Sequence, residues 1–230
     1  MISVVIPTLN EAANIAGLVC ALRAEPLACE IVVADGGSTD PTMALAREAG
    51  ADHVIAAPRG RGQQLAAGAE RASGEVIWFL HADTRLAFGT LAALEVAMTA
   101  DPTSPGGNFR LLFDGDDGFS RWLNGFYAWL RRRGFYYGDS GIFIRRSVLA
   151  AVGGVRPVAL MEDYDLVRRL ERAGRTLCIA EPPLLTSSRR FAGRAPARIV
   201  AGWVWIHLGY YCGVAPARLA SLYDSERSRG

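Results

Sequence analysis

His81-Ala82-Asp83 offers the first side chains in this sequence that could do chemistry, because it directly follows the apolar run at residues 76–80. A continuous apolar run of this length, rich in β-branched and aromatic residues, is typical of a strand buried on both faces. Ligands of open α/β sheets bind beyond the carboxyl ends of the strands. We therefore expect the Asp83 carboxylate at the rim of a binding crevice.

A second candidate is the adjacent pair Glu162 and Asp163, which opens a predicted helix with Leu166, Val167 and Leu170 on its inner face. A carboxylate held beside a hydroxyl group can accept its proton and so act as a general base. Acidic residues in the first turn of a helix also interact favourably with the helix dipole. The residue types alone leave both interpretations open.

Three more polar loops follow predicted strands in the first hundred residues. Their sequences are Pro7-Thr8-Leu9-Asn10-Glu11, Asp35-Gly36-Gly37-Ser38-Thr39-Asp40 and Arg59-Gly60-Arg61-Gly62. Because the carboxyl ends of parallel strands share one edge of a sheet, these loops should converge with Asp83. The convergence predicts a binding site at that edge.

Each of these residues also has a purely structural interpretation. Asn10 is expected to cap the following helix, and Glu11 can complement its dipole. Asp35 can form an Asx-type turn. Arg59 can be a solvated loop charge, and Arg61 is expected at the surface.

The elements that must position these residues indicate an α/β fold in one domain, residues 1–230. Strand and helix patterns alternate four times within residues 1–100, which predicts a mostly parallel central sheet flanked by helices. Residues 101–230 are less regular. They include a predicted helix at 118–131, whose aromatic residues are expected mainly in the core, a short strand at 142–144, and two closing C-terminal helices.

Composition excludes some partners and compartments. A net charge of +2 is too small to indicate a nucleic-acid partner. The four cysteines, Cys20, Cys29, Cys178 and Cys212, lack metal spacing and are expected as buried apolar residues in a reducing compartment. The chain starts in a strand pattern rather than a signal peptide. We therefore expect a cytoplasmic protein.

The segment 199–217 lacks Asp, Glu, Lys and Arg and approaches the length of a membrane span. Its glycines, its histidine and its tyrosine pair count against spanning. A helix packed on the protein, a homodimer contact and a peripheral contact with the inner face of a membrane are the alternatives.

Four motifs together resemble the inverting GT-A glycosyltransferases of family 2. They are Val4-Val5-Ile6-Pro7-Thr8-Leu9-Asn10-Glu11, Val33-Ala34-Asp35-Gly36-Gly37-Ser38-Thr39-Asp40, Leu80-His81-Ala82-Asp83 and Met161-Glu162-Asp163. The resemblance is greatest to short members associated with radical-SAM and selenodomain proteins, some of them named for arsenosugar biosynthesis. Gly138-Asp139-Ser140-Gly141-Ile142-Phe143 and Ser187-Ser188-Arg189-Arg190-Phe191 match that subgroup.

This resemblance implies transfer of a sugar from a nucleotide-diphosphate sugar to a hydroxyl acceptor, a small molecule or a lipid. Residues 1–100 would bind the nucleotide sugar, and residues 101–230 would bind the acceptor. The donor-binding residues would be Pro7, Thr8, Asn10, Glu11, Asp35, Arg59, Gln63, Ala82 and Asp83. Asp163 would be the catalytic base, with Glu162 positioning it or the acceptor.

The same resemblance implies a divalent metal, Mn²⁺ or Mg²⁺, held by Asp83. His81 stands where the family usually has an acid, and it is a second candidate ligand, a phosphate contact or a packed histidine. Asp139 and Ser140 would contact the acceptor, or simply form the turn. Arg189 and Arg190 would stabilise the diphosphate leaving group, or form a solvated charge cluster.

Three other functions are alternatives to this one. A sugar-1-phosphate nucleotidyltransferase would need a Gly-rich loop with a Lys after the first strand, and Pro7-Thr8-Leu9-Asn10 does not supply it. A non-catalytic nucleotide-sugar-binding protein is favoured only by His81. A membrane-surface glycosyltransferase with a lipid acceptor is favoured by the segment 199–217.

Overall fold

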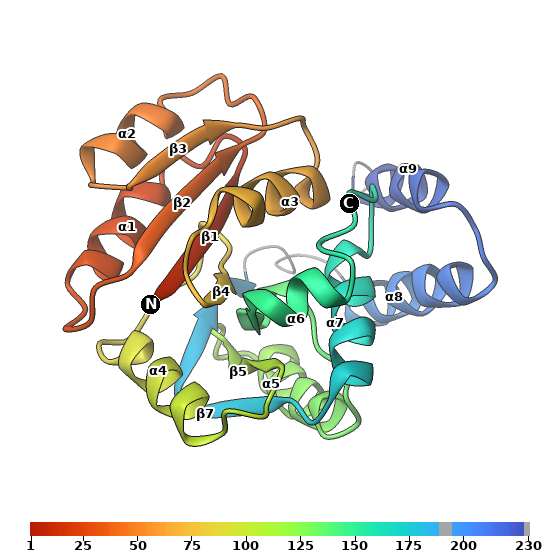
Figure 1. Cartoon of the computed structure of the whole chain (residues 1–230). Coiled ribbons are helices and arrows are strands. Elements are labelled where there is room, and N and C mark those ends of the chain that lie inside the picture. Colours follow the sequence, from red (N-terminus) through yellow and green to blue (C-terminus); the bar gives the residue numbers. More distant parts are fainter. Residues whose placement is uncertain (189–194, 228–230) are drawn as a thin grey trace.

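A computed structural model describes residues 1–188 and 195–227 (Figure 1). The strands are β1 (Ile2–Thr8), β2 (Glu30–Asp35), β3 (His53–Ala56), β4 (Val76–Phe79), β5 (Gly106–Phe113), β6 (Phe143–Arg145) and β7 (Leu177–Thr186). The helices are α1 (Ile15–Arg23), α2 (Thr42–Glu48), α3 (Arg61–Arg71), α4 (Thr90–Ala100), α5 (Gly118–Arg131), η1 (Gly138–Ser140), α6 (Arg146–Ala151), α7 (Glu162–Ala173), α8 (Pro196–Tyr211) and α9 (Pro216–Arg227). The predicted alternation of strand and helix in residues 1–100 is confirmed.

The strands form a single sheet in the order β3-β2-β1-β4-β6-β5-β7. β3, β2, β1 and β4 are parallel, β6 runs antiparallel to both of its neighbours, and β5 is parallel to β7. Gly107 allows β5 to approach β7, since a Cβ at this position would lie 2.0 Å from the Leu177 carbonyl oxygen. The mostly parallel sheet is therefore confirmed, with one reversed strand in its second half.

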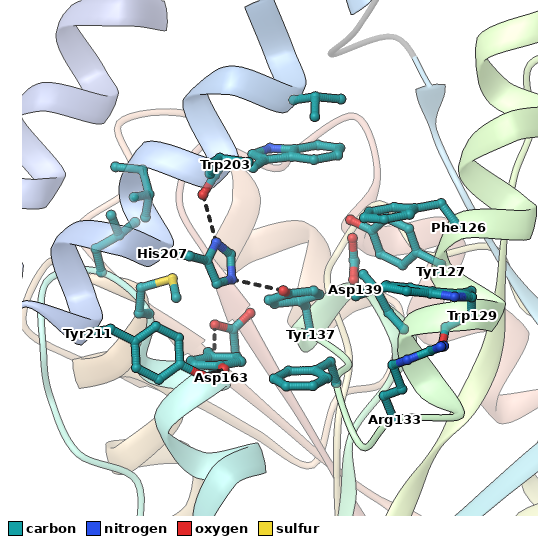
Figure 2. A pocket seen from close by; sticks show the side chains of 18 of the residues that line it. Phe126, Tyr127, Trp129, Arg133, Tyr137, Asp139, Asp163, Trp203, His207 and Tyr211 are labelled. Atoms are coloured by element: carbon teal, nitrogen blue, oxygen red, sulfur yellow. Dashed lines mark hydrogen bonds between the residues drawn. The ribbon is translucent and has the colours of Figure 1, made fainter. Parts of the chain in front are cut away.

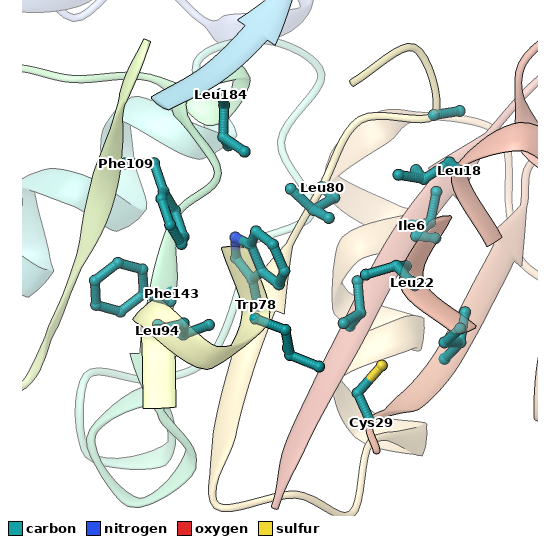
Figure 3. Close-up of a cluster of buried hydrophobic side chains, with 14 of the residues drawn as sticks. Ile6, Leu18, Leu22, Cys29, Trp78, Leu80, Leu94, Phe109, Phe143 and Leu184 are labelled. Carbon is teal, nitrogen blue, oxygen red and sulfur yellow. The ribbon is translucent and has the colours of Figure 1, made fainter. Parts of the chain in front are cut away.

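Alternate residues of the central strands point to opposite faces of the sheet, as a period of two requires. Val4 and Ile6 belong to a core shared with α1, α2, α4 and α5, whereas Val5 belongs to a core shared with α3, α6 and α7. Trp78 lies fully buried in the first core, among Phe109, Phe143 and Leu80 (Figure 3). The sheet is thus covered by helices on both faces.

The start of the first helix differs from the sequence-based expectation. β1 continues through Pro7 to Thr8, and α1 begins only at Ile15, with Asn14 rather than Asn10 at its N-cap position. Asn10 has a φ of 57°, in the left-handed region that asparagine tolerates better than most residues. The expectation that Asn10 caps the helix is therefore wrong.

The aromatic helix has the predicted bounds but not the predicted burial. α5 spans Gly118–Arg131, yet Trp122 and Trp129 are 45% and 41% exposed. Among its aromatic residues, Phe119 and Tyr127 are half-buried and pack on the main core. Most of its aromatic surface therefore lies outside the core.

The cysteines also differ from the expectation, because only Cys29 is buried while Cys20, Cys178 and Cys212 are exposed. All four are free thiols.

The apolar segment at 199–217 is divided between two helices, α8 and α9, which pack against each other beside α7 (Figure 1). Across residues 1–188 and 195–227, no helix is both long enough and apolar enough to cross a bilayer.

Candidate active site

Asp35 organises the first two loops at the carboxyl edge of the sheet. It is buried, and its Oδ1 accepts hydrogen bonds from the Gly37 and Ser38 amides at 3.0 and 2.8 Å. Its Oδ2 accepts from Thr8 Oγ1 at 2.9 Å and from Ser38 Oγ at 2.6 Å. Burial raises the pKa of Asp35, but these donors outweigh it and hold the pKa below its usual range. The Asx-type turn is therefore present, and the loop is built around a carboxylate anion.

Asn10 joins these two loops from its strained backbone position. Its amide donates to Ser38 Oγ at 2.8 Å, and its side-chain Oδ1 accepts from the Thr39 amide at 2.8 Å. Glu11 continues the connection, because its amide donates to Thr42 Oγ1 at 2.8 Å. The predicted sugar-nucleotide-binding residues Thr8, Asn10, Glu11 and Asp35 therefore form one connected cluster, and Pro7 is half-buried directly before Thr8.

Gln64, and not the predicted Gln63, links this cluster to α3. Gln64 is buried and donates to the carbonyl oxygens of Thr8 and Ala34, the latter at 3.1 Å. Gln63 is half-buried one position earlier. Gln64 lies four residues before Gly68, which faces Val5 and Ala34 of the sheet, so periodicity indicates the side of α3 on which it lies but not its acceptors.

His81 and Asp83 follow β4 as expected, and both are half-buried while Ala82 is buried. Within the described part of the chain, no group of three His, Cys, Asp or Glu side chains converges as a complete metal site. Mg²⁺ and similar ions are commonly held by only one or two carboxylates together with substrate phosphates and water. The single, partly exposed Asp83 at the end of β4 therefore fits a cation whose other ligands are substrate phosphates and water.

Asp163 lies at the start of α7, held by backbone donors from two segments. The Gly138 amide donates to its Oδ2 at 2.9 Å, and the Tyr164 amide donates to its Oδ1 at 2.7 Å. Glu162 beside it is buried as well, and the preceding Met161 has a φ of 66°. The first turn of α7 therefore presents two adjacent buried carboxylates.

Arg61 binds both of these carboxylates. Its Nε donates to Glu162 Oε1, and its Nη2 lies 3.3 Å from Asp163 Oδ2. The expectation that Arg61 lies at the surface is confirmed, because its side chain is 42% exposed, but its bonds to the two carboxylates were not predicted. Its partners are about a hundred positions away in the sequence, so the Arg-Gly-Arg-Gly pattern held no signal of them.

The two carboxylates titrate differently. Burial, followed by the neighbouring Asp163 charge, raises the pKa of Glu162, and Arg61 offsets this only in part. Burial also raises the pKa of Asp163, but Arg61, the Gly138 and Tyr164 amides and His81 together hold it below its usual range. Asp163 is therefore the acid of the pair that stays ionised, as a base must be.

The short helix η1 brings the end of β4 close to Asp163. A Cβ at Gly138 would lie 3.1 Å from both Asp163 Oδ2 and His81 Nε2, so both side chains crowd the same glycine. Asp139 and Ser140 are buried in η1, where Ser140 Oγ donates to the Tyr137 carbonyl oxygen at 2.6 Å. His81 thus faces the carboxylate pair.

A pocket of about 430 Å³ opens above this group. Arg61, His81, Asp139 and Asp163 line it, and aromatic side chains of α5 and α8 form its walls. Figure 2 shows Phe126 and Trp129 on one side and His207 and Tyr211 on the other, with Tyr137 and Asp163 between them. The candidate base is therefore reached through an aromatic pocket that the sequence did not predict as such.

Polar contacts fix α8 to this pocket. His207 Nδ1 lies 2.7 Å from the Trp203 carbonyl oxygen, which can only accept, so this nitrogen carries a proton. In the neutral imidazole, Nε2 then accepts from the Tyr137 hydroxyl at 2.9 Å. Tyr211 is hydrogen-bonded to Tyr164 of α7.

One predicted donor-binding residue is not brought into either cluster, and two further predicted residues cannot be placed. Arg59 is exposed in the loop before α3. Arg189 and Arg190 lie outside the described residues.

Comparison with known families gives one match, to the family described as glycosyl transferase family 2, over residues 3–152. Glycosyltransferase AglJ from Haloferax volcanii is 34% identical over 106 residues, which are 46% of this chain and 33% of that protein. The chain therefore spans about a third of the length of this curated relative.

Solved structures share the fold at low sequence identity. Glucosyl-3-phosphoglycerate synthase from Mycobacterium tuberculosis, in complex with phosphoglyceric acid, is 21% identical with a TM-score of 0.66, covering 93% of this chain and 80% of that one. A mannosyltransferase from Pyrobaculum calidifontis, in complex with GDP-Man and Mn²⁺, is 20% identical with a TM-score of 0.68, covering 98% and 68%. The synthase has also been solved with Mn²⁺ and UDP.

Proposed function

This chain belongs to glycosyl transferase family 2, and from that membership we propose that it transfers a sugar from a nucleoside-diphosphate sugar to a hydroxyl acceptor, inverting the anomeric carbon. The observation that carries the proposal is the position of Asp163. Its ionised carboxylate lies in a pocket beside His81. His81 is two positions before Asp83, whose carboxylate follows β4. A base and a diphosphate contact are therefore available from neighbouring segments.

Residues 1–100 bind the donor in this proposal. Its binding residues are Pro7, Thr8, Asn10, Glu11, Asp35, Arg59, Gln63, Ala82 and Asp83. The connected cluster around Asp35 supports the assignment, because its hydrogen bonds fix both loops at the carboxyl edge of the sheet, where ligands of α/β sheets bind. Nucleotides in complexes of structures with the same fold give further support.

Asp83 is the residue that would hold Mn²⁺ or Mg²⁺, and such a cation, when bound, supplies positive charge for the departing diphosphate. Its half-buried carboxylate suits an ion shared with substrate phosphates. His81 is the other candidate in the sequence, but it faces Asp163 across Gly138. We assign His81 to the acceptor side, as a neighbour of the base.

Asp163 acts as the base that this reaction needs. The acceptor oxygen attacks the anomeric carbon from the face opposite the diphosphate, forming the new carbon–oxygen bond as the old one breaks. The bonding electrons leave with the nucleoside diphosphate, and the hydroxyl proton passes to an Asp163 oxygen. The two amides on Asp163 fix its orientation for this transfer.

Arg61 is a positioning residue in this mechanism. Its guanidinium binds Glu162 and Asp163 together and lowers the pKa of Asp163, so that Asp163 is ionised before the acceptor arrives. Glu162, with its raised pKa, anchors the guanidinium. Because Arg61 begins α3, it also connects the donor half of the chain with the acceptor half, residues 101–230.

Within the family, we assign the chain to the short members associated with radical-SAM and selenodomain proteins. Gly138-Asp139-Ser140-Gly141 and Ser187-Ser188 support this assignment. Asp139 and Ser140 would contact the acceptor, and Arg189 and Arg190 would contact the diphosphate.

A thermal-shift panel of nucleoside diphosphates and their sugars, with and without Mn²⁺, tests the donor assignment. A nucleotide at 100 times its Kd should add about 2.7 kcal/mol to the free energy of unfolding. The chosen sugar nucleotide should then be hydrolysed slowly in Mn²⁺, with water replacing the acceptor.

Asp83→Ala should abolish the Mn²⁺-dependent part of the shift and the hydrolysis. Asp116→Ala, an acid in the loop before α5, is the matched control and should change neither. Hydrolysis at the wild-type rate in Asp83→Ala would remove Asp83 from the mechanism. Nucleotide binding without any hydrolysis would instead support a non-catalytic nucleotide-sugar-binding protein.

A further inference from the structure

The pocket above Asp163 has apolar, aromatic walls and an acidic floor. From that contrast we infer that the acceptor is an uncharged alcohol with an apolar body, its hydroxyl directed to Asp163 and its body held between α5 and α8. The inference rests on the proposed function, because it identifies the acceptor of that reaction. A volume of about 430 Å³ suits a small organic molecule.

One wall of the pocket is a rigid aromatic surface on α5. Phe126 stacks on Trp122 at a centroid distance of 4.8 Å and on Trp129 at 5.8 Å, with interplanar angles of 10° and 16°. Stacking fixes the side-chain rotamers before a ligand binds, which lowers the entropic cost of binding. Phe126 and Trp129 line the pocket, whereas Trp122 lies outside it.

The opposite wall is also apolar, because its polar atoms are bonded to one another. The Tyr137 hydroxyl is hydrogen-bonded to His207, and His207 in turn to the Trp203 carbonyl oxygen. The hydroxyls of Tyr164 and Tyr211 are hydrogen-bonded together. These rings therefore present carbon surface to the pocket, which favours an apolar body over a sugar or a peptide.

The floor carries more negative than positive charge. Asp139 and Asp163 line it, with Glu162 directly behind, while Arg61 is already bound to Glu162 and Asp163. A phosphate or carboxylate on the acceptor would meet these acids at close range, and like charges there cost free energy. A neutral hydroxyl, by contrast, can donate to Asp163.

Arg133 is the other described arginine of the pocket lining, and its guanidinium stacks on the Trp129 ring, 3.9 Å from the ring centroid. It lies on the wall and not beside Asp163. An anionic acceptor would have to recruit this residue, so phosphorylated compounds form a necessary arm of the test.

Isothermal titration calorimetry of the whole chain, saturated with its nucleoside diphosphate and Mn²⁺, tests the inference. Farnesol in neutral phosphatidylcholine vesicles and 4-phenylphenol in buffer represent a lipid source and a soluble source of the same chemistry. Farnesyl phosphate and 3-phosphoglycerate are the anionic counterparts. At least one alcohol should bind at least tenfold more tightly than either anion, and the stronger alcohol identifies the source.

Matched variants on one helix connect binding with the pocket. Trp129→Ala and Phe126→Ala should weaken alcohol binding at least tenfold. Trp122→Ala, from the same stacked row and of similar exposure, should weaken it less than either, because Trp122 lies outside the pocket and acts only by supporting the Phe126 ring. Tighter binding of an anion, no alcohol binding by the wild-type chain, or an equal loss in Trp122→Ala would overturn the inference.

Nucleotide binding and donor hydrolysis separate this inference from the proposed function. Trp122→Ala should retain both, since Trp122 is not in the pocket lining and its helix α5 lies away from β2 and α2 (Figure 1). If both are present in the wild-type chain and the alcohols fail, only the acceptor class is wrong. If neither is present, the proposed function itself fails.

Discussion

The centre of the sheet and helix α8, part of which lines the pocket, are both rich in large apolar residues, but they use them differently. Trp78 of β4 is fully buried, whereas Trp205 of α8 is 72% exposed. α8 buries Ile199 in the core and leaves Val204, Leu208 and Tyr211 exposed. Scattered exposed apolar residues are normal, but a group of them around a pocket indicates a contact surface.

The difference teaches that apolar content alone does not distinguish a core from a binding surface. The central strands are covered by helices on both faces, so nearly all of their side chains are buried. α5 packs on β5 and α8 packs on α9, and both leave large apolar side chains exposed. Family membership also rests on residues 3–152, whereas the carboxylate pair and α8 lie beyond that segment. The carboxylate pair and the α8 wall of the pocket are therefore outside the part that defines the family, whereas the α5 wall lies within it.

Asp163→Asn should give the largest effect, because it removes the proposed base from the pocket that the end of β4 shares with α8. General-base catalysis contributes about 10²–10⁴-fold, so donor hydrolysis should fall by about that factor, or roughly 2.7–5.4 kcal/mol. Nucleotide affinity, measured by thermal shift, should stay within about twofold. Hydrolysis within threefold of wild type, with nucleotide affinity intact, would show that Asp163 is not the base.

Trp78→Ala should destabilise the sheet core by about 3–5 kcal/mol, the usual cost of removing a buried aromatic side chain. The indole also donates to the Gly141 carbonyl oxygen at 3.2 Å, so the loop after η1 should loosen as well. Urea unfolding at neutral pH measures the loss. A loss below 1 kcal/mol would mean that the surrounding side chains rearrange to fill the space left by the indole.

Arg61→Gln should shift the pH dependence, because it removes the cation that lowers the pKa of both Asp163 and Glu162. A higher pKa of the base moves the acid limb of donor hydrolysis to higher pH. Arg59→Gln, which removes a cation two positions earlier, should leave that limb in place. If the acid limb of the pH profile is unchanged in Arg61→Gln, Arg61 does not set the pKa of the base.

The same substitution makes a prediction for stability, with its sign set by Asp163. Because the folded-state pKa of Asp163 is depressed, its contribution is present above the unfolded pKa of about 3.9 and is lost as pH falls through the folded value. The difference in unfolding free energy between wild type and Arg61→Gln should therefore be larger at pH 7 than below pH 4. The reverse order would contradict the charge assignment.

Trp205→Ala should have the smallest effect on stability, within about 0.5 kcal/mol, as is usual for exposed positions. Paired with Trp78→Ala in the same urea experiment, it measures the contrast between the two regions with one residue type. A loss approaching that of Trp78→Ala would show that the α8 surface is part of the fold's stability and not a free face.

Local sequence patterns predicted an element well where its structure depends on residues close together in the sequence. The strand before Asp83, the bounds of α5, and the start of α7 at Glu162 all follow from periodicity and turn residues. The position of Asp35 in an Asx-type turn follows in the same way, because its donors are two and three residues away.

The rest depends on contacts between distant segments, which no window of the sequence contains. Arg61 was missed because its partners are on α7, and Gln64 because its acceptors are on β1 and β2. Asn10 was misplaced because its true partner, the Thr39 amide, lies in the next loop. The burial of the α5 aromatics depends on what covers them, and that is a property of the whole fold.

The antiparallel strand β6 makes β4 a temporary edge during synthesis. β4 can pair with β1 as soon as residues 76–79 are made, but its other side waits for residues 143–145. At 5–20 residues per second, the roughly 60 intervening residues take about 3–12 s to add. During that time Val76-Ile77-Trp78-Phe79 presents unpaired backbone groups and large apolar side chains, which is a template for association between nascent chains. Soluble yield of this protein should therefore depend on chaperones that shield this edge until β6 arrives.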